Sequence, residues 1–141
     1  MYNITINEIL ENRRIKMKLP KFRAWFKEDK EMISVEEIAF ETKLVRGFYK
    51  LAIRWFKFEE VEFMSSTGLF DKNGTEIFEG DILADLDESG DELVYLYVIY
   101  KDGKFMAVEN EERGYSADLV DCTTYHSVVG NIYENAELLG R

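Results

Sequence analysis

Cys122 and His126 come closest to a nucleophile and its general base, since each is the only residue of its type in the chain and they lie four positions apart. On a late strand, this spacing would put both side chains on one face. Asp118 or Asp121 could supply the third group that must orient the histidine. A lone cysteine and a lone histidine are more often packing or surface residues, and zinc normally takes three or four such ligands. We therefore predict no catalytic pair and no zinc site.

Residues 85–90 resemble the first half of a calcium-binding loop. Asp85, Asp87 and Ser89 supply oxygen atoms at positions 1, 3 and 5, and a glycine follows at position 6. Position 12 should hold a bidentate glutamate, but Leu96 stands there. A short acidic loop between two strands explains the segment without a metal, so we predict no calcium site.

Glu76, Glu79 and Asp81 form another group of acidic residues, in a segment rich in turn signals. Paired carboxyl groups do acid–base chemistry when their surroundings separate their pKa values. Asp81 follows Gly80, and an aspartate in such a turn commonly accepts hydrogen bonds from its own backbone amides. The sequence has no Gly-rich phosphate loop, HExxH motif or GxSxG motif. We expect neither an enzyme nor a cofactor.

A basic stretch near the N-terminus has the composition of a nucleic-acid contact. Cations bind phosphates, and interleaved rings such as Phe22 and Trp25 stack on bases. The alternative, which we favour, places both rings in a strand and turns them toward the core. The candidates for a nucleic-acid or subunit contact are Arg13, Arg14, Lys16 and Lys18.

An amphipathic helix is predicted before Pro20. Thr5 and Glu8 have the spacing of a capping box, in which each side chain bonds to the backbone N–H of the other residue. Basic residues follow toward the C-terminal end of this helix of about three turns, where cations favour the helix dipole. A helix this short must dock on its own sheet or on a neighbour.

Alternation of polar and apolar residues predicts strands over most of the remaining chain. The double turn at residues 67–81 is the strongest local signal, because its Asn73-Gly74 pair tolerates positive φ. From there onward turns recur every 8–12 residues, which is typical of an antiparallel meander or barrel. The predicted strands are residues 21–25, 32–40, 61–64, 82–86, 92–100, 105–108 and 127–132, and residues 135–139 are expected to form one helical turn.

Residues 44–58 fit the period of a helix and that of a strand. Their β-branched and aromatic content favours strand. Arg46 and Gly47 could then turn a hairpin.

Length and composition indicate one compact domain. The chain has 141 residues, of which 46% are hydrophobic, enough for a packed core. A single cysteine permits no internal disulfide, which fits a reducing cytoplasm. No apolar run reaches the length of a membrane span, and the N-terminus lacks the features of a signal peptide. We expect a cytoplasmic protein without a membrane partner.

The net charge of −10 is divided unevenly. Residues 1–57 hold 13 Lys and Arg against 8 Asp and Glu, a balance of +5, and residues 58–141 hold 5 against 20, a balance of −15. Such asymmetry fits three arrangements: a solvated surface whose halves partly neutralise each other, complementary contacts between subunits, or a basic face for nucleic acid.

Three blocks of the sequence resemble the signature of the YopX family, proteins of bacteriophages and prophages. The blocks are residues 21–25, Met64 with residues 67–82, and residues 129–139. Ser65 and Ala136 stand where that signature usually has Gln and Pro. The residues that shape its turns are Gly68, Asp71, Asn73, Gly74, Gly80, Asp81, Gly130 and Asn131.

The resemblance implies a mainly β fold, an antiparallel β pseudo-barrel of residues 20–141, with residues 1–19 as a helical extension. It also implies homo-oligomers, and no activity, cofactor or catalytic residue. We therefore expect a non-enzymatic phage or prophage accessory protein that self-associates in the bacterial cytoplasm, with a host or phage protein as a possible partner. The alternative is a nucleic-acid-binding or host-regulatory module that uses the basic N-terminal segment.

Overall fold

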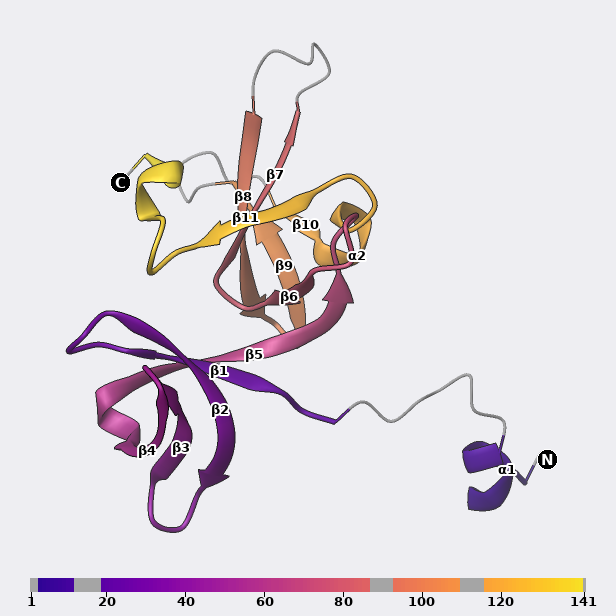
Figure 1. The fold of residues 1–141 in the computed structure, drawn as a ribbon. Helices are drawn as coiled ribbons and strands as arrows, with labels where there is room; N and C mark the ends of the chain where they lie inside the picture. The colour runs from indigo at the N-terminus through magenta and orange to yellow at the C-terminus, as the bar shows by residue number, and fades with distance from the viewer. Residues whose placement is uncertain (1–2, 12–18, 87–92, 110–115, 141) are drawn as a thin grey trace.

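Two antiparallel sheets make up most of the chain (Figure 1). The structure is a computed structural model that describes residues 3–11, 19–86, 93–109 and 116–140. Few helices accompany the sheets, and those described are short. The prediction of a mainly β, antiparallel fold is therefore confirmed.

The first sheet begins as a meander and ends in the double turn. Its strands are β1 (Phe22–Phe26), β2 (Glu31–Ala39), β3 (Leu44–Tyr49), β4 (Ala52–Lys57), β5 (Val61–Phe70) and β6 (Glu76–Phe78), with the 3₁₀ helix η1 (Phe58–Glu60) before β5. Strand β5 returns to pair with β1, so the order is β4-β3-β2-β1-β5-β6 and β4 is an edge strand.

The second sheet follows directly from the first. Its strands are β7 (Asp81–Leu86), β8 (Leu93–Lys101), β9 (Lys104–Val108), β10 (Ser116–Asp118) and β11 (Ser127–Asn131), in the order β10-β9-β8-β7-β11. The short helix α2 (Leu119–Cys122) lies between β10 and β11, and the 3₁₀ helix η2 (Ala136–Leu139) follows β11. The helical turn expected at residues 135–139 is thus present.

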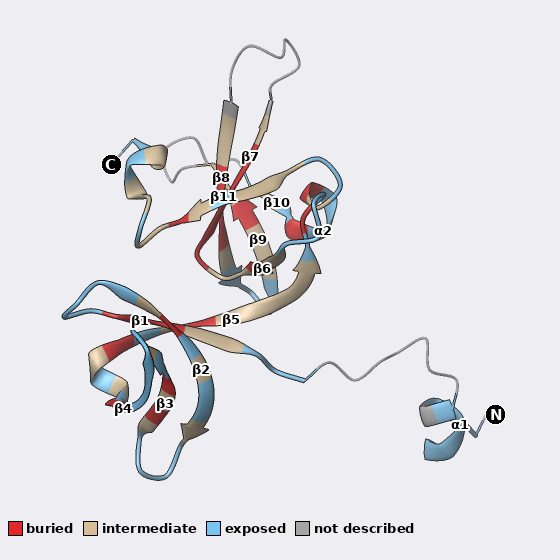
Figure 2. Cartoon of the chain, in the orientation of Figure 1, coloured by how far each residue is buried: buried red, intermediate tan, exposed pale blue. Residues whose placement is uncertain are grey.

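Each sheet has its own cluster of buried apolar side chains. Buried residues, red in Figure 2, accordingly lie in both sheets. The cluster of the first sheet consists of Ala24, Phe26, Ile33, Val45, Phe56 and Val61. The cluster of the second consists of Ile77, Leu83, Leu96, Val98, Ala107, Leu119 and Cys122. Because Ile77 lies on β6, the first sheet contributes to the second cluster.

Residues 44–57 form two strands, which confirms the strand interpretation. The turn between β3 and β4 lies at Lys50-Leu51, so the prediction of a turn at Arg46-Gly47 is wrong. Gly47 is instead central in β3, where β3 approaches β2 closely. A Cβ atom on Gly47 would clash with the Ile33 side chain and lie 2.6 Å from the Ser34 carbonyl oxygen.

Gly47→Ala is therefore expected to destabilise the fold by about 1–3 kcal/mol, because the Ser34 backbone must move to admit the methyl group. At an uncrowded strand position the same change would stabilise by about 0.5–1 kcal/mol. Urea denaturation followed by tryptophan fluorescence measures the difference. A gain in stability would show that β2 and β3 are not held this close.

The N-terminal helix α1 (Ile6–Glu11) has the predicted capping box: the Thr5 N–H donates to Glu8 Oε2 over 2.8 Å, and the Glu8 N–H donates to Thr5 Oγ1 over 3.2 Å. Ile6 is 73% exposed, and α1 lies apart from both sheets (Figure 1). The described part of the helix therefore does not dock on its own sheet. The candidates Arg13, Arg14, Lys16 and Lys18 lie outside the described residues.

No helix among the described residues is long and apolar enough to cross a membrane.

Candidate functional site

A largely buried, hydrogen-bonded group of polar side chains lies where the two sheets meet. Successive residues of β1 face opposite ways, so Ala24 and Phe26 enter the first cluster and Arg23 points away from it. The Arg23 guanidinium reaches Asp81 at the start of β7, with Nη2 2.5 Å from Oδ1. It also lies over the Phe78 ring, 4.8 Å from the centroid. We call this arrangement the Arg23–Asp81 joint.

Asp81 is only 1% exposed, and both of its oxygen atoms are occupied. Oδ1 accepts from Arg23, and Oδ2 accepts from the Phe78 backbone N–H over 2.8 Å. Burial raises the pKa of Asp81, and the charge of Arg23 and the Phe78 amide oppose that rise. A carboxylate so enclosed holds the sheets together and has no free face for a substrate.

Two further contacts reinforce the joint. The rings of Trp25 and Tyr133 stack with centroids 5.4 Å apart, and burial raises the pKa of the Tyr133 hydroxyl. The Gly80 N–H donates to the Val98 carbonyl over 2.8 Å, and the Gly80 carbonyl accepts from the Ile132 N–H over 2.9 Å. Gly80 has φ +85°, a conformation that favours glycine.

Asp71 organises the first half of the double turn. Its Oδ1 accepts from the N–H groups of Asn73 and Thr75, and its Oδ2 accepts from the N–H of Val128 on β11, each over 2.8 Å. The turn is closed by the Gly74 N–H, which donates to the Asp71 carbonyl over 3.0 Å. Asp71 thus ties the turn to the second sheet.

The third block of the signature shapes the chain after β11. Asn131 Oδ1 accepts from the N–H groups of Tyr133 and Glu134 over 3.0 and 2.9 Å. A Cβ atom on Gly130 would lie 2.9 Å from Asn135 Cβ. Gly68 has φ +82° and lies within the irregular pairing of β5 with β6. The turn residues of the second and third blocks therefore position backbone.

Cys122 and His126 are not on a strand, so that prediction is wrong. Leu119 and Cys122, three positions apart, bury one face of the helical turn α2. His126 Nδ1 lies 2.9 Å from the Cys122 carbonyl oxygen, so the imidazole contacts the backbone of Cys122 and not its thiol. Burial, with Asp121 nearby, raises the pKa of the Cys122 thiol. This geometry does not activate a nucleophile.

In the predicted acidic group at residues 76–81, Glu76 and Asp81 contact different cations, and Glu79 contributes its backbone carbonyl, which accepts from Arg23. Glu76 lies 3.4 Å from Lys21 Nζ, while Asp81 pairs with Arg23. Asp87 and Ser89 lie outside the described residues, and Asp85 is the last residue but one of β7. In the described part of the chain, no three His, Cys, Asp or Glu side chains gather as a metal site would need.

The β3–β4 hairpin carries a feature that sequence reasoning missed. Cross-strand partners are Leu44 with Lys57, Arg46 with Trp55, and Phe48 with Ile53. These six side chains form one face, opposite the buried Val45 and Phe56, and we call it the hairpin face. Phe48, Ile53 and Trp55 are each 45–48% exposed on it.

The charge of the hairpin is entirely positive. Residues 43–57 contain five Lys and Arg and no Asp or Glu, whereas residues 1–42 contain eight of each sign. The +5 balance of the N-terminal half therefore lies wholly in this hairpin. Charge counted over a short window, instead of over half the chain, would have found it.

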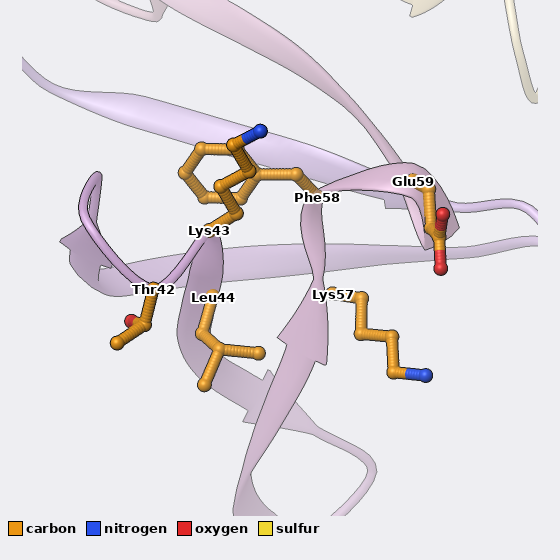
Figure 3. A pocket seen from close by; sticks show the side chains of 6 residues that line it. All are labelled: Thr42, Lys43, Leu44, Lys57, Phe58 and Glu59. Carbon is orange, nitrogen blue, oxygen red and sulfur yellow. The ribbon is translucent and has the colours of Figure 1, made fainter.

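A hollow of about 360 Å³ lies at one end of the hairpin face, between the turn before β3 and the end of β4 (Figure 3). Its walls are Thr42, Lys43, Leu44, Lys57, Phe58 and Glu59. A second hollow, of about 270 Å³, lies beside α2 and is lined by Leu69, Lys104, Phe105, Asp118, Leu119 and Val120. Neither brings together a nucleophile and a base.

Comparison with known proteins agrees with the fold and the signature. The family model described as "YopX protein" matches residues 21–140. Protein EF1440 from Enterococcus faecalis, known from a crystal structure, is 31% identical, with a TM-score of 0.58 over 86% of this chain and 98% of that one. Protein YopX from Bacillus subtilis is 18% identical, with a TM-score of 0.55 over 83% of this chain and 95% of that one. No curated protein matches. The chain belongs to the YopX family.

Proposed function

We propose that this chain is a non-enzymatic accessory protein of a phage or prophage, which self-associates in the bacterial cytoplasm. The basic hairpin of one copy meets the acidic part of the next. One observation carries the proposal: positive charge is concentrated in residues 43–57, the β3–β4 hairpin, and residues 58–141, which include all of the second sheet, carry −15. Opposite charges at separate places on one molecule favour contact between copies.

The polar groups support a non-enzymatic role. Asp71, Asp81 and Asn131 are the buried polar residues of the described chain, and each is bonded to backbone or to Arg23. Catalysis needs an acid, base or nucleophile with access to a substrate. These three lack that access, so the residues with the best-defined geometry serve the scaffold.

Sedimentation at two salt concentrations tests the self-association. At about 50 mM salt we expect a species larger than the 16.6 kDa monomer, and at about 0.5 M salt we expect a shift toward monomer, because salt screens exposed charges. A monomer at every salt concentration would overturn the proposal.

Gel shifts test the nucleic-acid alternative. A salt-steep shift that disappears when Arg13, Arg14 and Lys16 are neutralised would support it. On our proposal, no such shift is expected.

A further inference from the structure

We propose that the hairpin face of one copy docks on a surface around α2 of a second copy. This α2 surface consists of Val120, Tyr125, Asp118 and Asp121, together with the adjoining hollow of about 270 Å³. The inference rests on the proposed self-association and names the two surfaces that form the contact.

The hairpin face has the properties of an uncovered interface. Three large apolar side chains stand half-exposed beside one another on two paired strands, Phe48 and Ile53 as direct partners and Trp55 next along β4. Contiguous exposed apolar surface of this kind marks interaction sites. Tryptophan and arginine are also the residues most enriched where binding energy concentrates, and Arg46 lies 5.9 Å from the Trp55 ring centroid.

Strand β4 is an edge strand that neither a bulge nor a proline protects. It pairs with β3 in continuous register, without a bulge, and it contains no proline. Five of its six residues are exposed. Edge strands are usually protected by bulges, proline, cover or charged side chains, and of these β4 has only the charges of Arg54 and Lys57.

The α2 surface complements the hairpin face in polarity and in charge. Val120 is 58% exposed and Tyr125 is 64% exposed. Residues 116–126 contain Asp118 and Asp121 and no Lys or Arg. Asp118 pairs with Lys104 over 2.9 Å, so the exposed Asp121 is the carboxylate that faces a cation of another copy.

The hollow beside α2 suits a side chain. Leu69, Phe105, Leu119 and Val120 give it largely apolar walls. Its volume of about 270 Å³ falls below the roughly 300 Å³ at which small-molecule pockets begin. Lys104 and Asp118, which pair with each other, complete the walls. An aromatic side chain such as that of Trp55 fits the size and polarity of this place, and Lys57, next along the same face of β4, is the cation that would meet Asp121.

One molecule cannot satisfy both surfaces by itself. The hairpin face belongs to the outer part of the first sheet, whereas α2 packs against the second sheet, and the two lie well apart (Figure 1). The contact is therefore heterologous: each copy uses its hairpin toward one neighbour and its α2 surface toward another. Repetition of such a contact produces a closed ring or an open filament.

Complementation between two variants tests the contact. The hairpin variant combines Trp55→Ala with Lys57→Glu, and the α2 variant combines Val120→Ala with Asp121→Lys. Each variant alone is expected to associate about tenfold or more weakly than wild type, because it lacks one of the two surfaces. An equimolar mixture should form a 1:1 complex that does not grow, since only one intact surface of each kind remains.

The control combines Val129→Ala with Lys30→Glu. It also removes one exposed apolar side chain and reverses one exposed lysine, but outside both surfaces, and should sediment as wild type. Circular dichroism checks the folding of every variant, and the single changes Lys57→Glu and Asp121→Lys replace any double variant that does not fold.

The outcomes separate the two proposals. A wild-type monomer at every salt concentration overturns the self-association and this inference with it. If wild type associates and both variants associate equally well, or if the mixture forms no 1:1 complex, the contact proposed here is wrong and self-association stands. Association that nuclease treatment abolishes would mean that the hairpin face binds nucleic acid instead.

Discussion

Asp81→Ala is expected to lower the free energy of unfolding by about 3–5 kcal/mol, because it leaves Arg23 without its partner and the Phe78 N–H without its acceptor inside the joint. Asp81 is 1% exposed and the Arg23 side chain 17% exposed, so water replaces little of what is lost. Chemical denaturation at neutral pH measures the change.

Two comparisons distinguish a specific joint from a general loss of charge. Asp118→Ala removes an exposed carboxylate that is paired with Lys104, and should cost no more than about 1 kcal/mol. Replacing both partners, Asp81→Leu with Arg23→Met, should recover much of the stability, because an apolar pair carries no unpaired charge. A loss below about 1 kcal/mol for Asp81→Ala would mean that the sheets are held together elsewhere.

Asp71→Ala is the second large effect, with an expected loss of about 3 kcal/mol or more. The N–H groups of Asn73, Thr75 and Val128 lose their acceptor together, and a hydrogen bond to a charged group contributes about 1.5–3 kcal/mol. Asp29→Ala, at an exposed carboxylate 3.8 Å from Lys50, is the matched control and should change stability little. Equal losses in the two variants would contradict the role given to Asp71.

The same carboxylate makes stability depend on pH. Burial alone would raise the pKa of Asp71, but the backbone amides of Val128, Thr75 and Asn73, with the charge of Lys72, bring it below its usual 3.8. A carboxyl group whose pKa is lower in the folded state contributes stability that is complete above its unfolded pKa and is lost as the pH falls through its folded pKa. Wild type should lose this contribution in acid below 3.8, and Asp71→Asn should not.

Local patterns predicted most of the strands. The alternation at residues 21–25 and 32–40 corresponds to β1 and β2, and the Asn73-Gly74 signal corresponds to a turn in which Gly74 has φ +83°. Strand alternation and turn dipeptides are set by residues that are close in the sequence, so they can be recognised without knowledge of the fold. The capping box of Thr5 and Glu8 is of the same kind.

Long-range proximity could not be predicted in this way. Gly47 has the sequence context of a turn, and only the approach of β2 explains why a glycine stands in mid-strand. Arg23 and Asp81 lie 58 positions apart, and no local period connects them. The helical turn α2 has only four residues, too few to show the period of a helix. No local pattern therefore indicated that Cys122 lies on a helix rather than on a strand. The charge balance over residues 1–57 did not locate the positive charge in the hairpin. Residues 1–42 are neutral overall, so the whole excess lies in residues 43–57, and only a count over a short window shows this.

The position of the β3–β4 hairpin at the end of its sheet has an evolutionary consequence. Its inner side chains Val45 and Phe56 belong to the first cluster, but none of the side chains on the hairpin face takes part in that cluster, in the Arg23–Asp81 joint or in the Trp25–Tyr133 stack. Mutations on the hairpin face can therefore accumulate without loosening the rest of the protein, whereas mutations at the inward-facing Val45, Gly47 and Phe56 cannot. Relatives that share the joint can thus diverge in what they bind, and a hairpin transplanted from one relative to another would carry its binding preference with it.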